Sequence, residues 1–270
     1  MTTLDTTTAK YQAIVKKTYQ AFFSPSRYEE KSTEREVITW GNTYRLPVDG
    51  GELAVTTWGE SGPAVLLMHG WGGARAQMTG FVEPLLSAGY RVVAYDQPAH
   101  GESDGKMTNI LEITPTMDLV EKREGRFDAI IAHSFGTLIT SYALINRNFP
   151  PPTRLVYLGA FNRLLDSLPR FQVLANLPDE IIEGMRNMIY DNFGKGELDS
   201  IVNETMTQQI HIPTLMFHDA ADNVTPVDDS RAIARAWKSA QFIETTGLGH
   251  RGALQSGEVH AQVVNFLQNK

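Results

Sequence analysis

The chain has 270 residues, 42% of them hydrophobic and 20% charged, which suffices for one large α/β domain or for a domain with an insertion. It contains no cysteine, which excludes disulfides, thiolate metal sites and a cysteine nucleophile, and its net charge of −7 argues against nucleic acid as a partner. No basic-then-apolar signal opens the sequence and no apolar run reaches membrane-spanning length, so we expect a cytoplasmic protein.

The first expected element is an amphipathic helix within residues 1–40. Its apolar side chains fall on one side at helical spacing: Tyr11, Ile14, Val15, Tyr19, Phe22 and Phe23. Pro25 disfavours helix at the residue before it, so the helix should end there. Packing on the domain surface explains the stripe better than a membrane or partner helix does. Residues 1–40 are therefore predicted to form an N-terminal helical extension.

The next segments predict a sheet. Residues 43–48 and 52–58 read as a hairpin around Asp49-Gly50-Gly51. Further strands are predicted at the short apolar runs 64–68, 91–95, 128–132, 154–158, 214–217 and 241–245. Helical patterns lie between or after them, at about 77–88, 107–125, 134–145 and 256–267. Strands that alternate with helices indicate a mostly parallel sheet with helices on both faces.

Residues 161–212 interrupt this rhythm, because they show no strand pattern. Their apolar side chains recur at helical spacings, with breaks near Pro169, Pro178 and 194–196. They are predicted to be an inserted helical segment, which leaves 41–160 and 213–270 as the core. Such a stripe most often packs against the core, and that part of it lines a substrate cavity is a hypothesis.

The sequence 127–137 joins a buried strand to a helix at Ser134, with no loop residues between them. A junction this tight strains the backbone of the turn residue and requires small neighbours, which Ala132 and Gly136 supply. It would expose the Ser134 hydroxyl beside the unpaired amide of Phe135 at the start of the helix. Acyl transfer requires this geometry.

Two more loops follow predicted strands. In His69-Gly-Trp-Gly-Gly73 the glycines allow a sharp turn that leaves amides above the sheet edge, and no Gly-Lys-Ser/Thr follows to indicate a phosphate site. The loop 96–105 holds carboxylates and a histidine, so a metal or acid–base site must be considered. We expect instead that Asp96 and Ser103 satisfy local backbone donors and that His100 is structural as well.

With these motifs the chain resembles the α/β-hydrolase superfamily, in its serine-nucleophile branch of esterases and lipases with a helical cap. The G-x-S-x-G elbow appears at 132–136 with alanine first, H-G-x at 69–71, and D-x-P-G-H-G-x-S at 96–103 with Ala99 where glycine is usual. The resemblance spans about residues 43 to 268. It implies an α/β-hydrolase fold, a mostly parallel central sheet flanked by helices, with 161–212 as the inserted cap.

The resemblance also implies a site. The triad follows in the order Ser134, Asp222, His250, because H-G-x-x-D-x-x-x-P matches 218–226 and His250 sits on a glycine-flanked loop after the last strand. Asp219 is the alternative acid. The amides of Trp71 and Phe135 would form the oxyanion hole, and the Trp71 indole would wall the acyl pocket or join the core. No cofactor and no metal is expected.

The predicted protein is therefore a serine hydrolase that cleaves a small to medium apolar carboxylic ester through an acyl-enzyme. Thioesterase, amidase or peptidase, acyltransferase and C–C hydrolase chemistry use the same triad and stay open, as does a ligand-binding, receptor-like member with little turnover. Dehalogenases and epoxide hydrolases of this fold need a carboxylate nucleophile, against which Ser134 argues. The expected partner is a small-molecule ester, with no nucleic acid and no membrane span; the sequence favours neither a monomer nor a homodimer.

Overall fold

A computed structural model of the chain describes residue 6, residues 8–147 and residues 149–269. Their strands form one eight-stranded sheet in the order β1-β2-β4-β3-β5-β6-β7-β8. These strands are β1 (Asn42–Val48), β2 (Gly51–Trp58), β3 (Ala64–Met68), β4 (Arg91–Tyr95), β5 (Ala129–His133), β6 (Arg154–Leu158), β7 (Thr214–Asp219) and β8 (Ala240–Thr245). The pairs β1–β2 and β2–β4 are antiparallel and all other neighbours are parallel, which confirms the predicted sheet.

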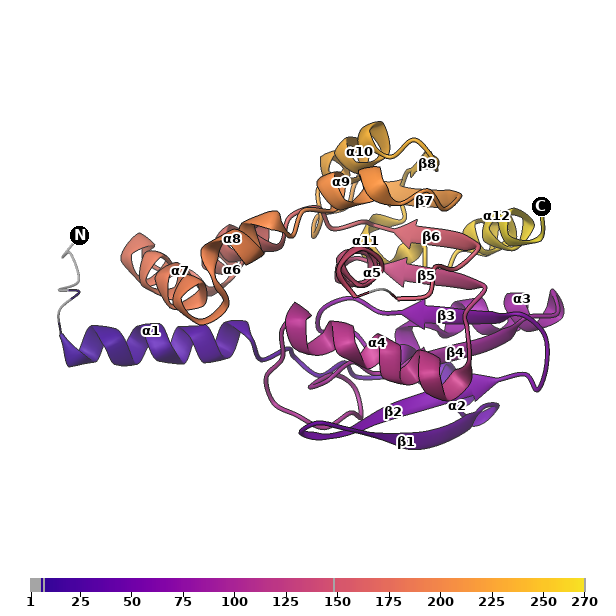
Figure 1. Cartoon of the computed structure of the whole chain (residues 1–270), viewed down its shortest axis with the longest axis horizontal. Coiled ribbons are helices and arrows are strands. Elements are labelled where there is room, and N and C mark those ends of the chain that lie inside the picture. The colour runs from indigo at the N-terminus through magenta and orange to yellow at the C-terminus, as the bar shows by residue number, and fades with distance from the viewer. Residues whose placement is uncertain (1–5, 7, 148, 270) are drawn as a thin grey trace.

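Helices cover both faces of this sheet (Figure 1). One face packs against α4 (Ile110–Glu124), α5 (Phe135–Asn146) and α10 (Val227–Ala236). The other face packs against α2 (Ser32–Thr39), the 3₁₀ helix η1 (Arg75–Phe81), α3 (Val82–Ser87) and α12 (Gly257–Gln268). The predicted α/β-hydrolase fold is thereby confirmed.

The two cores form because the central strands are apolar on both faces. In β3, Leu66 and Met68 belong to the cluster under α4 and α5, whereas Val65 and Leu67 belong to the cluster under α3 and α12. Successive side chains of a strand point to opposite faces, so a continuous apolar run fills both layers. The sheet is therefore buried on both sides and holds its carboxyl edge rigidly.

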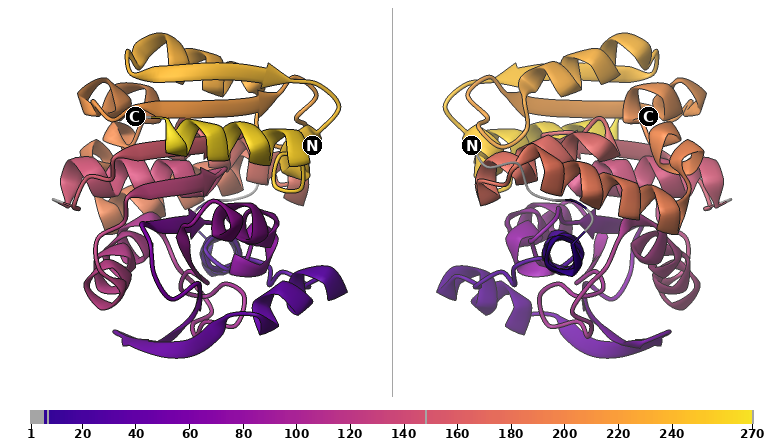
Figure 2. Two further views of the ribbon diagram at one scale, coloured as in Figure 1. Left: turned by 90° about the vertical axis from the view of Figure 1, so that its right-hand side faces the viewer. Right: turned by 90° about the vertical axis from the view of Figure 1, so that its left-hand side faces the viewer.

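The segment between β6 and β7 contributes no strand to the sheet. It contains η2 (Leu164–Asp166), α6 (Ser167–Ala175), α7 (Asp179–Phe193), α8 (Lys195–Ser200), α9 (Asn203–Met206) and η3 (Thr207–Gln209). The N-terminal helix α1 (Ala9–Phe22) lies against α7, with α6 and α8 close by, on the opposite side of the molecule from α3 and α12 (Figures 1 and 2). Helix α1, near the N-terminus, and the helices that follow β6 therefore lie together at one side of the molecule.

Three local features differ from the sequence expectations. Helix α2 was not predicted, and the helix expected at 77–88 is divided into η1 and α3, because Pro84 in a continuous helix would lose a backbone hydrogen bond and clash with the preceding turn. The placement of His250 on a loop is wrong: it lies in α11 (Gly249–Gly252), a single helical turn whose first residue, Gly249, has a positive φ. Within the described residues, no helix combines the length and apolar character needed to cross a bilayer.

Candidate active site

Ser134 is the only residue between β5 and α5, and its backbone is strained. Its φ is 51° and its ψ is −122°, a conformation that non-glycine residues rarely adopt and that costs of order 1–3 kcal/mol. The turn is held on both sides: the Ser134 amide donates to Leu158 O at 2.9 Å, and its carbonyl accepts from the Thr137 amide at 3.0 Å. The strained turn expected from the sequence is present, and it leaves the serine at the carboxyl edge of the sheet.

Two glycines let the neighbouring backbone approach this turn. A Cβ on Gly136 would lie 2.7 Å from His69 O, and a Cβ on Gly70 would lie 2.9 Å from Ser134 Cβ. Both distances are shorter than real Cβ contacts, so any side chain would force the β3 loop away from the elbow. The small residues at these positions therefore bring the two loops into direct contact.

The amides of Trp71 and Phe135 are the two predicted donors of the oxyanion hole. Gly73 N donates to Gly70 O at 3.0 Å, closing a turn with Trp71 and Gly72 at its corners, and Phe135 is the first residue of α5. Among the described residues, neither the Trp71 nor the Phe135 N–H donates a hydrogen bond. First-turn amides of a helix lack an intrahelical acceptor, so the Phe135 N–H is available to an anion.

Asp222 and His250 are hydrogen-bonded to each other. The ring Nδ1–H of His250 donates to Asp222 Oδ2 at 2.7 Å, which leaves Nε2 as the acceptor nitrogen. The other carboxylate oxygen accepts from the Val224 and Thr225 amides at 2.8 and 2.9 Å. The Asp222 side chain is only 1% exposed, and burial alone would raise its pKa. Hydrogen bonds from His218, His250 and the Thr225 amide outweigh burial and lower that pKa, so the carboxylate stays ionised.

Two buried histidines that the sequence analysis did not assign to the site support this pair. His218 Nε2 lies 3.2 Å from Asp222 Oδ2 and donates to Thr225 O at 2.9 Å. His133 Nε2 donates to the backbone carbonyl of His250 at 2.9 Å, and the two rings pack at a centroid distance of 4.7 Å. Burial lowers the pKa of His133 to about 3, so its ring is neutral. The position of His133 beside Ser134 in the elbow was the only sequence signal for its role.

The remaining candidate residues are engaged elsewhere. Asp219 accepts from the Ala221 and Leu248 amides and from the Thr245 hydroxyl, and no hydrogen bond joins it to His250 among the residues that the structure covers. In the 96–105 loop, Asp96 accepts from the Arg75 and Glu102 amides.

Two other side chains of the 96–105 loop, Ser103 and His100, also form hydrogen bonds with backbone groups. Ser103 Oγ accepts from the Ala54 amide, and His100 Nδ1 donates to Pro98 O. No group of three or more histidine, aspartate or glutamate residues in the described chain could hold a metal. The expectation that Asp96 and Ser103 satisfy backbone donors therefore holds.

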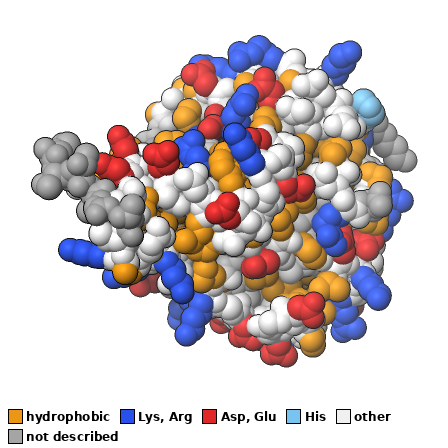
Figure 3. All heavy atoms as spheres, turned by 60° about the vertical axis from the view of Figure 1, so that its left-hand side comes forward, with side chains coloured by type: hydrophobic (Ala, Val, Ile, Leu, Met, Phe, Trp, Pro, Cys, Tyr) orange, Lys and Arg blue, Asp and Glu red, His pale blue; other side chains and the backbone are white. Residues whose placement is uncertain are grey.

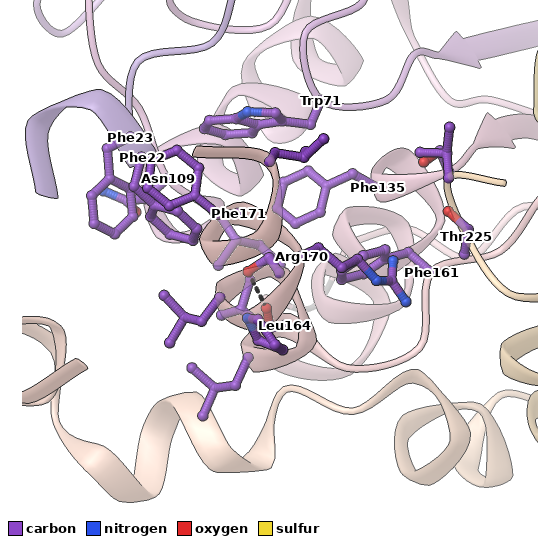
Figure 4. A pocket seen from close by; sticks show the side chains of 18 of the residues that line it. Phe22, Phe23, Trp71, Asn109, Phe135, Phe161, Leu164, Arg170, Phe171 and Thr225 are labelled. Atoms are coloured by element: carbon purple, nitrogen blue, oxygen red, sulfur yellow. Dashed lines mark hydrogen bonds between the residues drawn. The ribbon is translucent and has the colours of Figure 1, made fainter. Parts of the chain in front are cut away.

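Ser134 and His250 border one cavity of about 770 Å³. Figure 4 shows part of its lining. Its walls are mainly aromatic and aliphatic, and Trp71, Phe135 and Phe161 line it together with residues of α1, α6 and α7. The Trp71 and Phe135 rings meet edge to face at 5.6 Å. No hydrogen bond joins Ser134 Oγ to the His250 ring among the described residues, but both open onto the same space. A volume of this size accommodates a small organic molecule.

Known proteins share this fold. The family model described as "Alpha/beta hydrolase family" matches residues 64–264. Over 172 residues the chain is 26% identical to a serine hydrolase-like protein of Danio rerio, covering 62% of this chain and 47% of that protein; the chain spans about half the length of this curated relative.

Solved structures with the same fold include an esterase of Pyrococcus furiosus (TM-score 0.67, 20% identity, 90% of this chain and 98% of that one). A bacterial membrane phospholipase A is similar too (TM-score 0.67, 18% identity, 88% and 90% covered). At these identities the structural likeness supports the fold alone. The family match covers most of the chain, and the chain therefore belongs to the alpha/beta hydrolase family.

Proposed function

We propose that this protein is a serine hydrolase that cleaves a small to medium apolar carboxylic ester through an acyl-enzyme intermediate. Ser134 is the nucleophile, His250 the general base and acid, and Asp222 the residue that orients His250. The observation that carries the proposal is the 2.7 Å Asp222–His250 hydrogen bond beside a strained serine that borders the same cavity.

In the first half of the reaction, His250 Nε2 takes the proton of the Ser134 hydroxyl as its oxygen attacks the ester carbonyl. A serine hydroxyl is a weak nucleophile at neutral pH, so it needs this base. The imidazolium that forms is stabilised by Asp222, whose lowered pKa keeps it ionised throughout. His250 then returns the proton to the leaving alcohol, and water resolves the acyl-enzyme by the same steps.

The growing charge on the carbonyl oxygen meets the amides of Trp71 and Phe135. Both N–H groups lack acceptors among the described residues, so neither must break a bond to bind the oxyanion. One such donor typically contributes about 10²–10³ in turnover. The cavity walls are mainly apolar; of the charged side chains that line them, Arg170 is paired with Asp229 and Arg251 is exposed, so the lining favours an uncharged acyl group.

The proposal includes a division of the chain. Residues 41–160 and 213–270 form the α/β-hydrolase core, 161–212 form a helical cap, and 1–40 form an N-terminal extension. The support is positional: α6 and α7 border the cavity that holds Ser134, while the sheet and its flanking helices hold the reacting side chains.

Ser134→Ala tests the assignment on a chromogenic short-chain ester. We expect kcat to fall by at least about 10³-fold, because the acyl-enzyme can no longer form. Ser167→Ala is the matched control, since Ser167 lines the same cavity but only donates to Leu164 O at 2.6 Å. Full activity in Ser134→Ala, or equal losses in both variants, would contradict the proposal.

A further inference from the structure

The C-terminal end of α1 forms part of the cavity that holds Ser134. Phe22 and Phe23 line this cavity although they lie more than one hundred residues before the serine in the sequence. Figure 4 shows both rings on the side of the cavity away from Phe135 and Thr225, which mark the catalytic end. The cavity therefore extends from the nucleophile to the N-terminal helix.

Specific contacts fix α1 in this position. Tyr11 and Val15 are buried against α7, and the Tyr11 hydroxyl donates to Glu180 O at 2.8 Å. A Cβ on Gly184 would lie 2.3 Å from that hydroxyl oxygen, so α7 has a glycine where α1 approaches it. At the other end of the helix, Phe23 O accepts from the Thr108 amide at 2.9 Å.

The two phenylalanine rings are in turn held by aromatic neighbours from the 161–212 segment. Phe22 meets Phe171 of α6 edge to face at 5.3 Å, and Phe23 lies 5.7 Å from Phe193 of α7. These rings form a wall with few rotamer choices, because each packs against another ring. A ligand long enough to reach this wall therefore contacts aromatic surface that a shorter ligand does not.

The lining between this wall and Ser134 suits a hydrocarbon chain. Leu164, Leu165, Leu168 and Ile189 contribute aliphatic surface. The charged side chain of Arg170 is already engaged, with Asp229 at 3.1 Å and over the Phe161 ring at 4.9 Å. On α6, Val173 and Leu174 border the cavity and are 80% and 85% exposed, so apolar surface continues to the outside. Figure 3 shows the molecule with the left-hand side of Figure 1 turned forward, and hydrophobic side chains lie among charged ones on this face.

We propose that the substrate's acyl group is an unbranched medium-length chain whose distal methylenes pack against Phe22 and Phe23, so that α1 sets the acyl-length preference. The inference rests on the proposed function, and it names the acyl class and the residues that select it. Both rings lie outside residues 64–264, so this determinant is a property of this chain rather than of the shared family core. Each methylene buried in the cavity should raise kcat/KM about fourfold until the chain reaches α1.

The test compares ethyl and octyl fluorophosphonates as covalent probes of the full-length protein. In the wild type, the octyl probe has six more methylenes than the ethyl probe and should inactivate on the order of 10³-fold faster, with the adduct on Ser134 by mass spectrometry. Phe22→Ala and Phe23→Ala should each lower the octyl rate about tenfold and leave the ethyl rate unchanged. Phe22→Leu keeps apolar packing on Phe171, so it should lower the octyl rate less than Phe22→Ala does. It controls for a displacement of α1 by the alanine substitution.

Phe266→Ala is the matched control, because Phe266 lies under Arg154 at 5.7 Å and away from this cavity. It should leave both rates unchanged. An octyl-to-ethyl ratio that is near one in the wild type, or that Phe22→Ala and Phe23→Ala leave unaltered, would overturn the inference while the labelled serine still supports the hydrolase. Absence of any adduct on Ser134 would instead contradict the proposed function itself.

Discussion

Two regions of this molecule combine a carboxylate and a histidine at the carboxyl edge of the sheet, and of the two histidines only His250 borders the cavity within the described residues. After β7, Asp222 accepts from the ring of His250, which borders the cavity. After β4, Asp96 is bound by Arg75 and by backbone amides, and the fully buried His100 donates to Pro98 O. Residue type alone does not distinguish them; what differs is whether the histidine keeps an accessible nitrogen.

Asp222→Asn should cause the largest loss of activity and tests the pair that borders the cavity. The amide cannot stabilise the imidazolium and favours the wrong His250 tautomer, so we expect kcat on a short-chain ester to fall about 10⁴-fold. Asp219→Asn is the control, since Asp219 accepts from the Ala221, Leu248 and Gly249 amides and no hydrogen bond joins it to His250 among the described residues. If kcat fell more in Asp219→Asn than in Asp222→Asn, the acid of the triad would be Asp219 and the assignment of Asp222 would be wrong.

Asp96→Asn should act on stability instead of catalysis. The Arg75 and Asp96 side chains are 1% and 0% exposed, and removal of one charge leaves the buried guanidinium with only the more exposed Glu102 as an anionic partner. We expect the free energy of unfolding to drop by about 3 kcal/mol in urea titrations. The folded fraction should keep wild-type kcat, and a selective loss of kcat without loss of stability would contradict the structural role.

A fall in pH should destabilise the fold, because three buried histidines are neutral in the folded state. Burial lowers the pKa of His69 to about 4 and that of His100 and His133 to about 3, against about 6.5 in an unfolded chain. The unfolded state thus binds more protons below pH 6.5, so this stability is complete above pH 6.5 and is lost as the pH falls toward 4. Each ring should contribute up to about 1.4 kcal/mol per pH unit. Unfolding free energies that stay constant from pH 6.5 to 5 would refute this.

Ala99→Gly should give the smallest effect. Ala99 adopts a φ of 64° in the turn that follows β4, where the resembling family has glycine. Relief of this left-handed strain should raise the free energy of unfolding by up to about 1 kcal/mol, partly offset by the greater freedom of glycine when unfolded. Thermal unfolding measures the change, and a clear decrease in stability would show that the methyl group's packing matters more than the strain.

Much of this organisation follows from local sequence signals. The strands were predictable because β3 to β7 are short apolar runs, and the Ser134 turn was predictable because the small residues Ala132 and Gly136 permit a tight junction between strand and helix. Asp222 and His250 were identified by motif and chain order, and the structure brings the two side chains together. Their catalytic role stays a prediction.

The features that the sequence did not predict depend on contacts between residues that lie far apart in the chain. Nothing near Arg75 predicts its burial against Asp96, and nothing near Phe22 predicts that it faces a cavity formed by residues 150 positions later. Arg27 similarly ties the segment between α1 and α2 to the 96–105 loop, because its guanidinium donates to the carbonyls of Gly101, Ser103 and Gly105. Such contacts depend on the tertiary arrangement, which local periodicity does not encode.

The most direct test of the central claim is the reaction of the wild-type protein with a fluorophosphonate at neutral pH, followed by peptide mass spectrometry. A single adduct on Ser134 is expected, together with loss of esterase activity in proportion to labelling and much slower labelling in His250→Ala. Labelling at another residue, or labelling of Ser134 at the same rate without His250, would contradict the account.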